Sequence, residues 1–441
     1  CHVQRNIFLA EIITCDWPRG FHNTGVNILL FADDIVLIAD TEDELQAMLN
    51  VAGAFATKWS IKFNEHKSKV LVFGQKCDFS KRWALGNSLI NECEEYKYLG
   101  VYIQRNLKCS YHISKYLKPI CDRKIAAMKH TLSKNANVNR IEFGNTIWHQ
   151  VIRPTIMHGS SAWGNISIEG MKMIQSIQYQ CAKNIMKCSL NVSRKIILEE
   201  LGWEDIETSI NKARVKYFER IMNLDSERLT YKFFAQMYSI PANKNVWEFC
   251  KQIKSSFQTV GLDFMYSLDT NKNNIYKIFE RFCKYKVREM SYNEANIYHL
   301  LAKTQKLQMK PYLKDTYGFV LSSLKFKART GVIGLNADLK RMSMRKYDIC
   351  EDCNAEVSED IIHVLFRCQK YQDKRQLFLG KFLDLCISHE MEDIFYDFMT
   401  LSDLCKTSVL LDIEPVDDFC TELDHAFKLF LKECNSLRFS K

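Results

Sequence analysis

Proline and glycine are scarce in this chain, which has only 6 prolines and 16 glycines among its 441 residues. It also lacks serine, glutamine and proline tracts and internal repeats, so we expect no low-complexity region and no obvious flexible linker. The longest apolar run is interrupted by Asp33 and Asp34, which leaves no segment able to span a membrane. The hydrophobic content of 47% and the charged content of 26% are typical of globular proteins. The length predicts two or three domains.

Cysteine is abundant by contrast, with 17 residues in the chain. Their odd number and the lack of a signal peptide favour free thiols in a reducing compartment over a secreted disulfide framework. We therefore expect an intracellular location, in the nucleus, the cytoplasm or both. The sequence begins with Cys1 rather than Met, which predicts that it is a fragment of a longer reading frame.

Two adjacent carboxylates, Asp33 and Asp34, stand between two apolar runs of strand length within residues 26–40. Such runs indicate buried strands, and their junction at an acidic dipeptide predicts a hairpin with the acids at its turn. Neighbouring carboxylates repel each other unless a cation keeps both ionised. Mg²⁺ binds one or two carboxylates together with substrate phosphates, which suits two-metal nucleotidyl transfer. The alternative is an ordinary turn dipeptide, like Asp417 and Asp418, which have no flanking strands.

Three further patterns follow this dipeptide in order. Residues 41–59 have apolar side chains at helical spacing and a capping box formed by Thr41 and Glu44, which predict an amphipathic helix. Residues 64–68 read Asn-x-x-Lys-Ser, and residues 96–101 predict an aromatic strand that ends at a glycine turn. A lone lysine or a single glycine turn has an ordinary structural explanation, so the order and spacing of the motifs carry the functional interpretation.

In this order the motifs resemble the palm domain of reverse transcriptases, in the form typical of non-LTR (LINE-type) retrotransposons. The resemblance rests on Phe31-Ala32-Asp33-Asp34, Asn64-x-x-Lys67-Ser68 and Tyr98-Leu99-Gly100, and it extends more loosely over roughly residues 25–375. It implies RNA-directed DNA synthesis from deoxynucleoside triphosphates, with an RNA template and a DNA primer or target.

The resemblance also implies roles for single residues. Asp33 would be a direct Mg²⁺ ligand, with Asp34 as its support. Lys67 would aid the leaving pyrophosphate. The primer grip, which positions the primer end, would consist of Tyr98, Leu99 and Gly100.

A second constellation lies near the other end of the chain, with the spacing Cys350-x2-Cys353-x9-His363-x4-Cys368. Three thiolates and one imidazole complete a closed, tetrahedral Zn²⁺ site of the structural kind. The order of these ligands resembles the zinc knuckle that follows the reverse transcriptase in many non-LTR elements. The alternative for His363 is a core histidine among its apolar neighbours.

Basic residues are concentrated in residues 97–140, which hold ten lysines and arginines against the single acid Asp122. The net charge of the whole chain is +9. Apolar residues interleave there, as in helices with one face on a core and one toward phosphates. A solvated charged face is the alternative. The nucleic-acid contacts that we expect are Lys108, Lys115, Lys118, Arg123, Lys124 and Lys129. Trp148 and Trp163 are interpreted first as core aromatics.

The predicted fold is α+β, a partial polymerase palm followed by a mostly helical thumb and connector and a small zinc knuckle. The expected parts are the palm of antiparallel strands plus a helix (1–103), the thumb (104–190), the helical connector (191–330), the CCHC knuckle (331–375) and a helical tail (376–441).

A palm of this family also needs a third metal-binding aspartate on an upstream strand. Only 32 residues precede Asp33, too few to hold that strand and the fingers as well, and Asp16 stands beside a turn-like sequence. We therefore expect the fragment to be inactive, with an incomplete Mg²⁺ site. The competing hypothesis is a non-enzymatic protein that binds zinc and nucleic acid and derives from a decayed polymerase.

Overall fold

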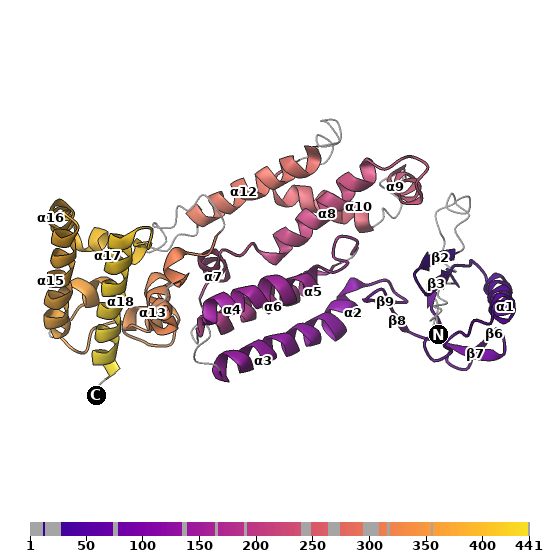
Figure 1. Cartoon of the computed structure of the whole chain (residues 1–441), viewed down its shortest axis with the longest axis horizontal. Helices are drawn as coiled ribbons and strands as arrows, with labels where there is room; N and C mark the ends of the chain where they lie inside the picture. The colour runs from indigo at the N-terminus through magenta and orange to yellow at the C-terminus, as the bar shows by residue number, and fades with distance from the viewer. Residues whose placement is uncertain are drawn as a thin grey trace. The chain divides into compact units, whose positions relative to one another are not determined.

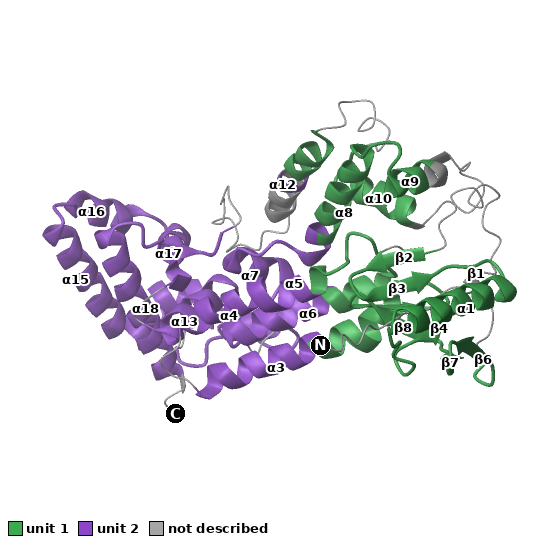
Figure 2. Cartoon of the chain, turned by 45° about the vertical axis from the view of Figure 1, so that its right-hand side comes forward, with its two compact units in different colours: residues 1–120, 156–174, 210–282 green, residues 121–155, 175–209, 283–441 purple. Residues whose placement is uncertain are grey.

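The computed structural model describes residues 12–13, 28–73, 78–134, 139–163, 166–188, 192–239, 248–262, 274–293, 308–314, 318–353 and 356–439. Helices predominate among them, and the strands lie in the first quarter of the chain (Figure 1). The fold is α+β, as predicted, although the described strands are not all antiparallel, as the predicted palm would have them. Two compact units are present, one of residues 1–120, 156–174 and 210–282 and the other of residues 121–155, 175–209 and 283–441 (Figure 2).

The described strands all belong to the first unit and form small sheets. β2 (Ile28–Phe31) pairs antiparallel with β3 (Asp34–Leu37), and β8 (Glu95–Tyr98) pairs antiparallel with β9 (Val101–Gln104). In a three-stranded sheet, β7 (Ser88–Glu92) lies between β4 (Lys69–Val70), which is parallel to it, and β6 (Arg82–Leu85), which is antiparallel. β1 (Ile12–Ile13) pairs in parallel with β5 (Val72–Phe73). The predicted hairpin at Asp33 and Asp34 is therefore present, and the predicted glycine turn after the aromatic strand is part of a second hairpin.

The predicted amphipathic helix is α1 (Glu42–Lys58), which packs against β6. Thr41 Oγ1 accepts a hydrogen bond from the N–H of Glu44, but the Glu44 carboxylate accepts from the N–H of Asp40 rather than from that of Thr41. The amide of Gln46 exchanges two hydrogen bonds with the backbone of Ala84 in β6. The core under this helix consists of Leu37, Ala39, Leu45, Leu49, Val70, Val72, Trp83, Leu85 and Ile90.

β2 differs from the buried strand that its apolar sequence predicts. All four of its side chains are exposed, from 37% for Leu29 to 66% for Leu30, whereas Val36 and Leu37 of β3 are buried. Among the described strands only β3 pairs with β2, so β2 is an edge. A strand is buried only where another layer covers it, and the described residues supply no such layer over β2.

After β9, the chain is helical. α2 (Cys109–His112) continues through the π-helical turn η2 (Ile113–Leu117) into α3 (Lys118–Lys134). The next elements are α4 (Arg140–Ile147), η3 (Trp148–Ile152), α5 (Arg153–Met157), α6 (Ile168–Met186), α7 (Arg194–Leu201), α8 (Ile206–Met222), α9 (Leu229–Ser239), α10 (Glu248–Thr259) and α12 (Ile275–Asn293). None of the described helices is both long and apolar enough to cross a membrane.

Trp148 and Trp163 are both buried, which confirms their interpretation as core aromatics. The Trp148 ring stacks on that of Trp203, with the ring centroids 4.5 Å apart.

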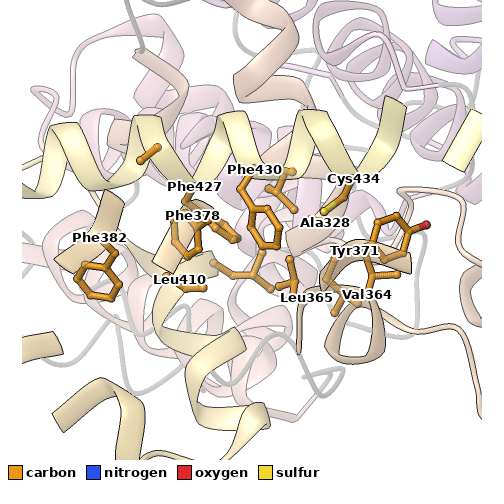
Figure 3. Packing of buried hydrophobic residues seen from close by; sticks show 14 of the residues in the cluster. Ala328, Val364, Leu365, Tyr371, Phe378, Phe382, Leu410, Phe427, Phe430 and Cys434 are labelled. Atoms are coloured by element: carbon orange, nitrogen blue, oxygen red, sulfur yellow. The ribbon is translucent and has the colours of Figure 1, made fainter. Parts of the chain in front are cut away.

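The end of the second unit has one continuous hydrophobic core. Its elements are η6 (Pro311–Lys314), α13 (Phe319–Arg329), α14 (Asn336–Arg341), η7 (His363–Arg367), η8 (Gln369–Tyr371), α15 (Gln372–Ser388), α16 (Glu392–Thr400), α17 (Asp403–Asp412) and α18 (Asp418–Phe439). Phe378 of α15 stacks on Phe430 of α18 with ring centroids 5.0 Å apart (Figure 3). Cys350 and Cys368 belong to the same core. The predicted knuckle and tail therefore share buried side chains.

This part of the second unit also contains buried ion pairs. The ammonium groups of Lys325 in α13 and Lys428 in α18 lie 2.5 and 2.7 Å from the two carboxylate oxygens of Asp424. Arg329 pairs with Glu200 of α7 at 3.1 Å. All five side chains are buried, so each charge depends on its partner in a medium of low dielectric constant.

Candidate active site and metal site

The two carboxylates predicted to be catalytic lie at the end of the β2–β3 hairpin. Phe31 pairs with Asp34, so Ala32 and Asp33 form a two-residue turn, which we call the catalytic turn. Ala32 has a left-handed φ of 53° at the first turn position, where glycine is the usual residue. Asp33 is exposed at the tip of the turn, and Asp34 is half-buried as the first residue of β3. The hairpin thus presents two neighbouring carboxylates at one end.

The electrostatics of this turn involve a nearby lysine. Burial and the charge of Asp33 raise the pKa of Asp34, and the ammonium of Lys67 partly opposes that shift. The pKa of Tyr96 in β8 is raised by burial and by the charge of Asp34. The Tyr96 hydroxyl donates to the backbone carbonyl of Lys67 at 3.0 Å. Side chains from β3, β8 and the loop before β4 therefore meet beside Asp34, and a divalent cation would relieve the repulsion between the two carboxylates.

The segment Asn64–Ser68 forms a compact turn that presents Lys67. Asn64 Oδ1 accepts from the N–H groups of His66 and Lys67 at 3.1 and 3.3 Å. The buried Ser68 hydroxyl donates back to the Asn64 carbonyl at 2.9 Å. Asn64 and Ser68 of the Asn-x-x-Lys-Ser motif therefore have structural roles, because the asparagine caps the turn and the serine closes it. They leave the lysine side chain exposed.

The three residues predicted as the primer grip lie at the end of the β8–β9 hairpin. Tyr98 pairs with Val101, so Leu99 and Gly100 form a two-residue turn, the Leu99–Gly100 turn. Both turn residues are left-handed, with φ of 46° and 86°. This is the turn type that matches the twist of antiparallel strands. Since side chains alternate along a strand, Tyr96 and Tyr98 share one face of β8.

Cys350, Cys353, His363 and Cys368, which we call the Cys/His cluster, come together in the second unit. Their ligand atoms all lie within 4.8 Å of one another. Cys350 Sγ is 4.0 Å from Cys368 Sγ, and Cys353 Sγ is 3.4 Å from His363 Nε2. Zinc with Zn–S bonds of about 2.3 Å and Zn–N bonds of about 2.0 Å places tetrahedral ligands about 3.5 to 3.8 Å apart. The donor set and its spacing therefore fit a tetrahedral metal ion.

Local backbone hydrogen bonds explain how this sequence assembles the cluster. The bridge between Ile349 and Ser358 closes the first turn, with the Cys350 N–H donating to the Val357 carbonyl at 2.8 Å. The π-helical turn η7 spans the second pair, because the Cys368 N–H donates to the His363 carbonyl at 2.7 Å. A spacing of four residues between histidine and cysteine is what one π-turn requires.

Burial affects the protonation of these ligands. It raises the pKa of Cys350 to about 12 and also raises that of Cys368. It lowers the pKa of His363, whose buried Nδ1 has no hydrogen-bond partner among the described residues. The imidazole is thus neutral at pH 7, which leaves Nε2 able to donate its lone pair to a metal ion.

The six predicted nucleic-acid contacts lie along consecutive elements. Lys108 precedes α2, Lys115 lies in η2, Lys118 begins α3, and the others follow in α3. Lys108, Lys115, Arg123 and Lys129 are exposed. The Lys124 ammonium instead donates to the Thr155 hydroxyl at 2.6 Å and is half-buried. The opposite face of α3 is buried and consists of Cys121, Ile125, Met128 and Leu132.

Comparison with known proteins finds similarity to reverse transcriptases. Residues 6–103 match the family described as reverse transcriptase (RNA-dependent DNA polymerase). The chain is 25% identical over 226 residues to the RNA-directed DNA polymerase from mobile element jockey of Drosophila funebris, a match that covers 48% of the chain and 24% of that protein. It is also 25% identical over 231 residues to the probable RNA-directed DNA polymerase from transposon X-element of Drosophila melanogaster, covering 50% and 25% respectively.

Residues 6–103 of the chain are therefore similar to reverse transcriptases, and both relatives are named as RNA-directed DNA polymerases of mobile elements. The chain spans about a quarter of the length of these curated relatives. The catalytic turn, Lys67 and the Leu99–Gly100 turn all lie inside the matched reverse transcriptase region. The Cys/His cluster and the basic residues after residue 103 lie outside it.

Two side chains at this site were not predicted as site residues. Tyr96 lies beside Asp34, and its position two residues before Tyr98 on the same strand was the available signal. His158 contacts the Leu99–Gly100 turn, although 59 residues separate it from Leu99.

Proposed function

We propose that this chain supplies the catalytic turn and the primer grip of an RNA-directed DNA polymerase, which uses deoxynucleoside triphosphates, an RNA template and a DNA primer. The observation that supports this most is the meeting of Asp34, Lys67 and Tyr96 next to the exposed Asp33. An ordinary surface turn needs neither a second carboxylate nor a lysine whose charge lowers the pKa of one of them.

In this proposal Asp33 and Asp34 hold Mg²⁺, Asp33 directly and Asp34 as its support. Bound Mg²⁺ would stabilise the attacking and leaving oxygens during nucleotidyl transfer. Lys67, exposed beside Asp34, neutralises charge on the departing pyrophosphate. The Leu99–Gly100 turn, with Tyr98, positions the primer end.

The same proposal assigns supporting roles to the rest of the chain. Residues 104–190 act as the thumb, and the exposed basic residues there contact phosphates of the template and primer. The Cys/His cluster holds a structural Zn²⁺, because three thiolates and one imidazole leave no open coordination position. This zinc would order the loop that contains Cys350 and Cys353.

The experiment is primer extension on an RNA template, with the chain alone and with the chain joined to the fingers and upstream palm of a jockey-type relative. We expect no extension by the chain alone, because the described residues offer only Asp33 and Asp34 at this turn and two-metal chemistry needs both ions clamped. The joined protein should extend the primer. Asp33→Ala should reduce extension to background, while the exposed helix residue Asp43, changed to Ala, should leave it unchanged.

An active Asp33→Ala protein would refute the catalytic assignment. A joined protein that folds and binds an RNA–DNA hybrid but extends no primer would favour the non-enzymatic alternative.

A further inference from the structure

The Leu99–Gly100 turn has a hydrogen-bond partner outside its own hairpin. The carbonyl oxygen of Leu99 lies 2.8 Å from Nε2 of His158. A carbonyl can only accept, so His158 Nε2 must carry the hydrogen of this bond. Both the neutral Nε2–H tautomer and the imidazolium provide that donor.

The same imidazole packs against the second residue of the turn. A Cβ added to Gly100 would lie 2.8 Å from His158 Nε2, closer than real Cβ contacts. A glycine at position 100 suits the backbone φ of 86°, and it also leaves room for the close approach of the ring. Gly159, the residue after His158, also lies close to the hairpin. A Cβ added to Gly159 would lie 3.0 Å from a methyl group of Val101.

The backbone around His158 is held in place by its own hydrogen bonds. α5 ends at Met157, whose carbonyl accepts from both the N–H and the hydroxyl of the buried Ser160 at 3.1 and 2.9 Å. A second histidine contacts the hairpin on β9, where His112 Nδ1 accepts from the N–H of Tyr102 at 3.2 Å. His112 is buried, whereas the His158 side chain is exposed. His158 thus contributes a specific contact rather than core packing.

The hairpin needs such external contacts. β8 and β9 form a two-stranded sheet in which no other described strand takes part, and isolated two-stranded hairpins are marginally stable in water. Leu99 also occupies a left-handed conformation that is unfavourable for a residue with a Cβ. Without an outside partner, the tip would sample other conformations.

We propose that His158 is a positioning residue that fixes the Leu99–Gly100 turn and thereby the primer 3′ end. The role at the primer rests on the proposed function, whereas the contact with the turn does not. A displacement of about 1 Å at reacting groups can cost about a hundredfold in rate, so a turn held by a ring from a distant segment is of direct use to a primer grip.

The first test is amide hydrogen exchange of residues 98–102 in the purified chain without nucleic acid. His158→Ala should accelerate exchange there by about threefold to tenfold, the range for removal of one hydrogen bond. His158→Gln should restore protection, because its amide nitrogen can donate from nearly the same place. His130→Ala, a change at an exposed histidine of α3, is the matched control and should have no effect. Unchanged exchange in a folded His158→Ala protein would overturn the proposal.

A double-mutant cycle tests the close approach at Gly100. Gly100→Ala should disturb exchange of the hairpin less in the His158→Ala background than in the wild-type background, because the ring that the new Cβ meets is gone. Equal effects in both backgrounds would contradict the packing of His158 on Gly100.

The second test separates positioning from general stability. We would measure the affinity of the chain for an RNA–DNA hybrid with a recessed primer 3′ end, and for the same hybrid with that end closed by a loop. His158→Ala should lower the preference for the recessed end by about threefold to tenfold, and His158→Gln should restore it. A merely structural role would weaken both affinities alike. If exchange responds to His158→Ala but the wild-type chain shows no preference for a primer end, the primer-grip assignment in the proposed function is wrong, and the role of His158 at the primer with it.

Discussion

Loss of the proposed zinc from the Cys/His cluster is the perturbation with the clearest expected consequence. Cys353→Ser removes one of the three thiolates while changing a side chain that is only half-buried. Cys405→Ser is the matched control, because Cys405 is a free, exposed cysteine in the same unit. Both variants make the same chemical change, and only the first removes a ligand.

The expected magnitude follows from where the cluster lies. Cys350 and Cys368 are part of the core that includes α13, α15 and α18, so a metal ion bound there stabilises the folded unit and not only a loop. Zinc present at a thousandfold excess over its dissociation constant contributes about 4 kcal/mol of unfolding free energy. For a unit of about 230 residues, this corresponds to a shift in Tm of about 8 to 16 °C.

Elemental analysis and thermal unfolding provide the assay. The wild-type chain and Cys405→Ser should carry one equivalent of zinc after gentle purification, and a strong chelator should lower their Tm by the stated amount. Cys353→Ser should carry less than half an equivalent and respond little to the chelator. Equal metal content in Cys353→Ser and Cys405→Ser, or a Tm that the chelator leaves unchanged in the wild type, would refute the zinc assignment.

Two further predictions concern charge. The first variant neutralises four basic residues together, Lys115, Lys118, Arg123 and Lys124, and it should weaken binding to all nucleic-acid sequences alike. The slope of log affinity against log salt concentration should flatten by about 0.7 to 0.9 for each phosphate that the protein no longer neutralises. An unchanged slope would show that these residues form a solvated face. Asp424→Asn leaves the ammonium groups of Lys325 and Lys428 buried without their carboxylate and should cost about 3 to 5 kcal/mol of unfolding free energy in denaturant titrations. Because burial lowers the pKa of Lys325 to about 8 from 10.5, its contribution to stability is present above about pH 10.5 and is lost as the pH falls through about 8. In the Asp424→Asn protein this loss should move to lower pH, and an unshifted pH profile would contradict the pairing.

Features formed by contacts within a few residues were predictable from the sequence. The catalytic turn followed from an acidic dipeptide between two apolar runs, and the Leu99–Gly100 turn from a glycine after an aromatic strand. The Cys/His cluster followed from ligand spacing, because one short turn and one π-turn are enough to bring its members together. In each case the residues that form the local structure lie close together in the sequence, so their order and spacing predict it.

Tertiary structure decided the features that join distant segments. Nothing in the spacing places Tyr96 beside Asp34 or His158 on Leu99, since these pairs meet only when separate elements fold together. The same holds for the ion pair of Glu200 and Arg329, which are 129 residues apart. The exposure of β2 was missed for the related reason that an apolar sequence states what a strand can bury, while burial itself depends on whether another layer covers it.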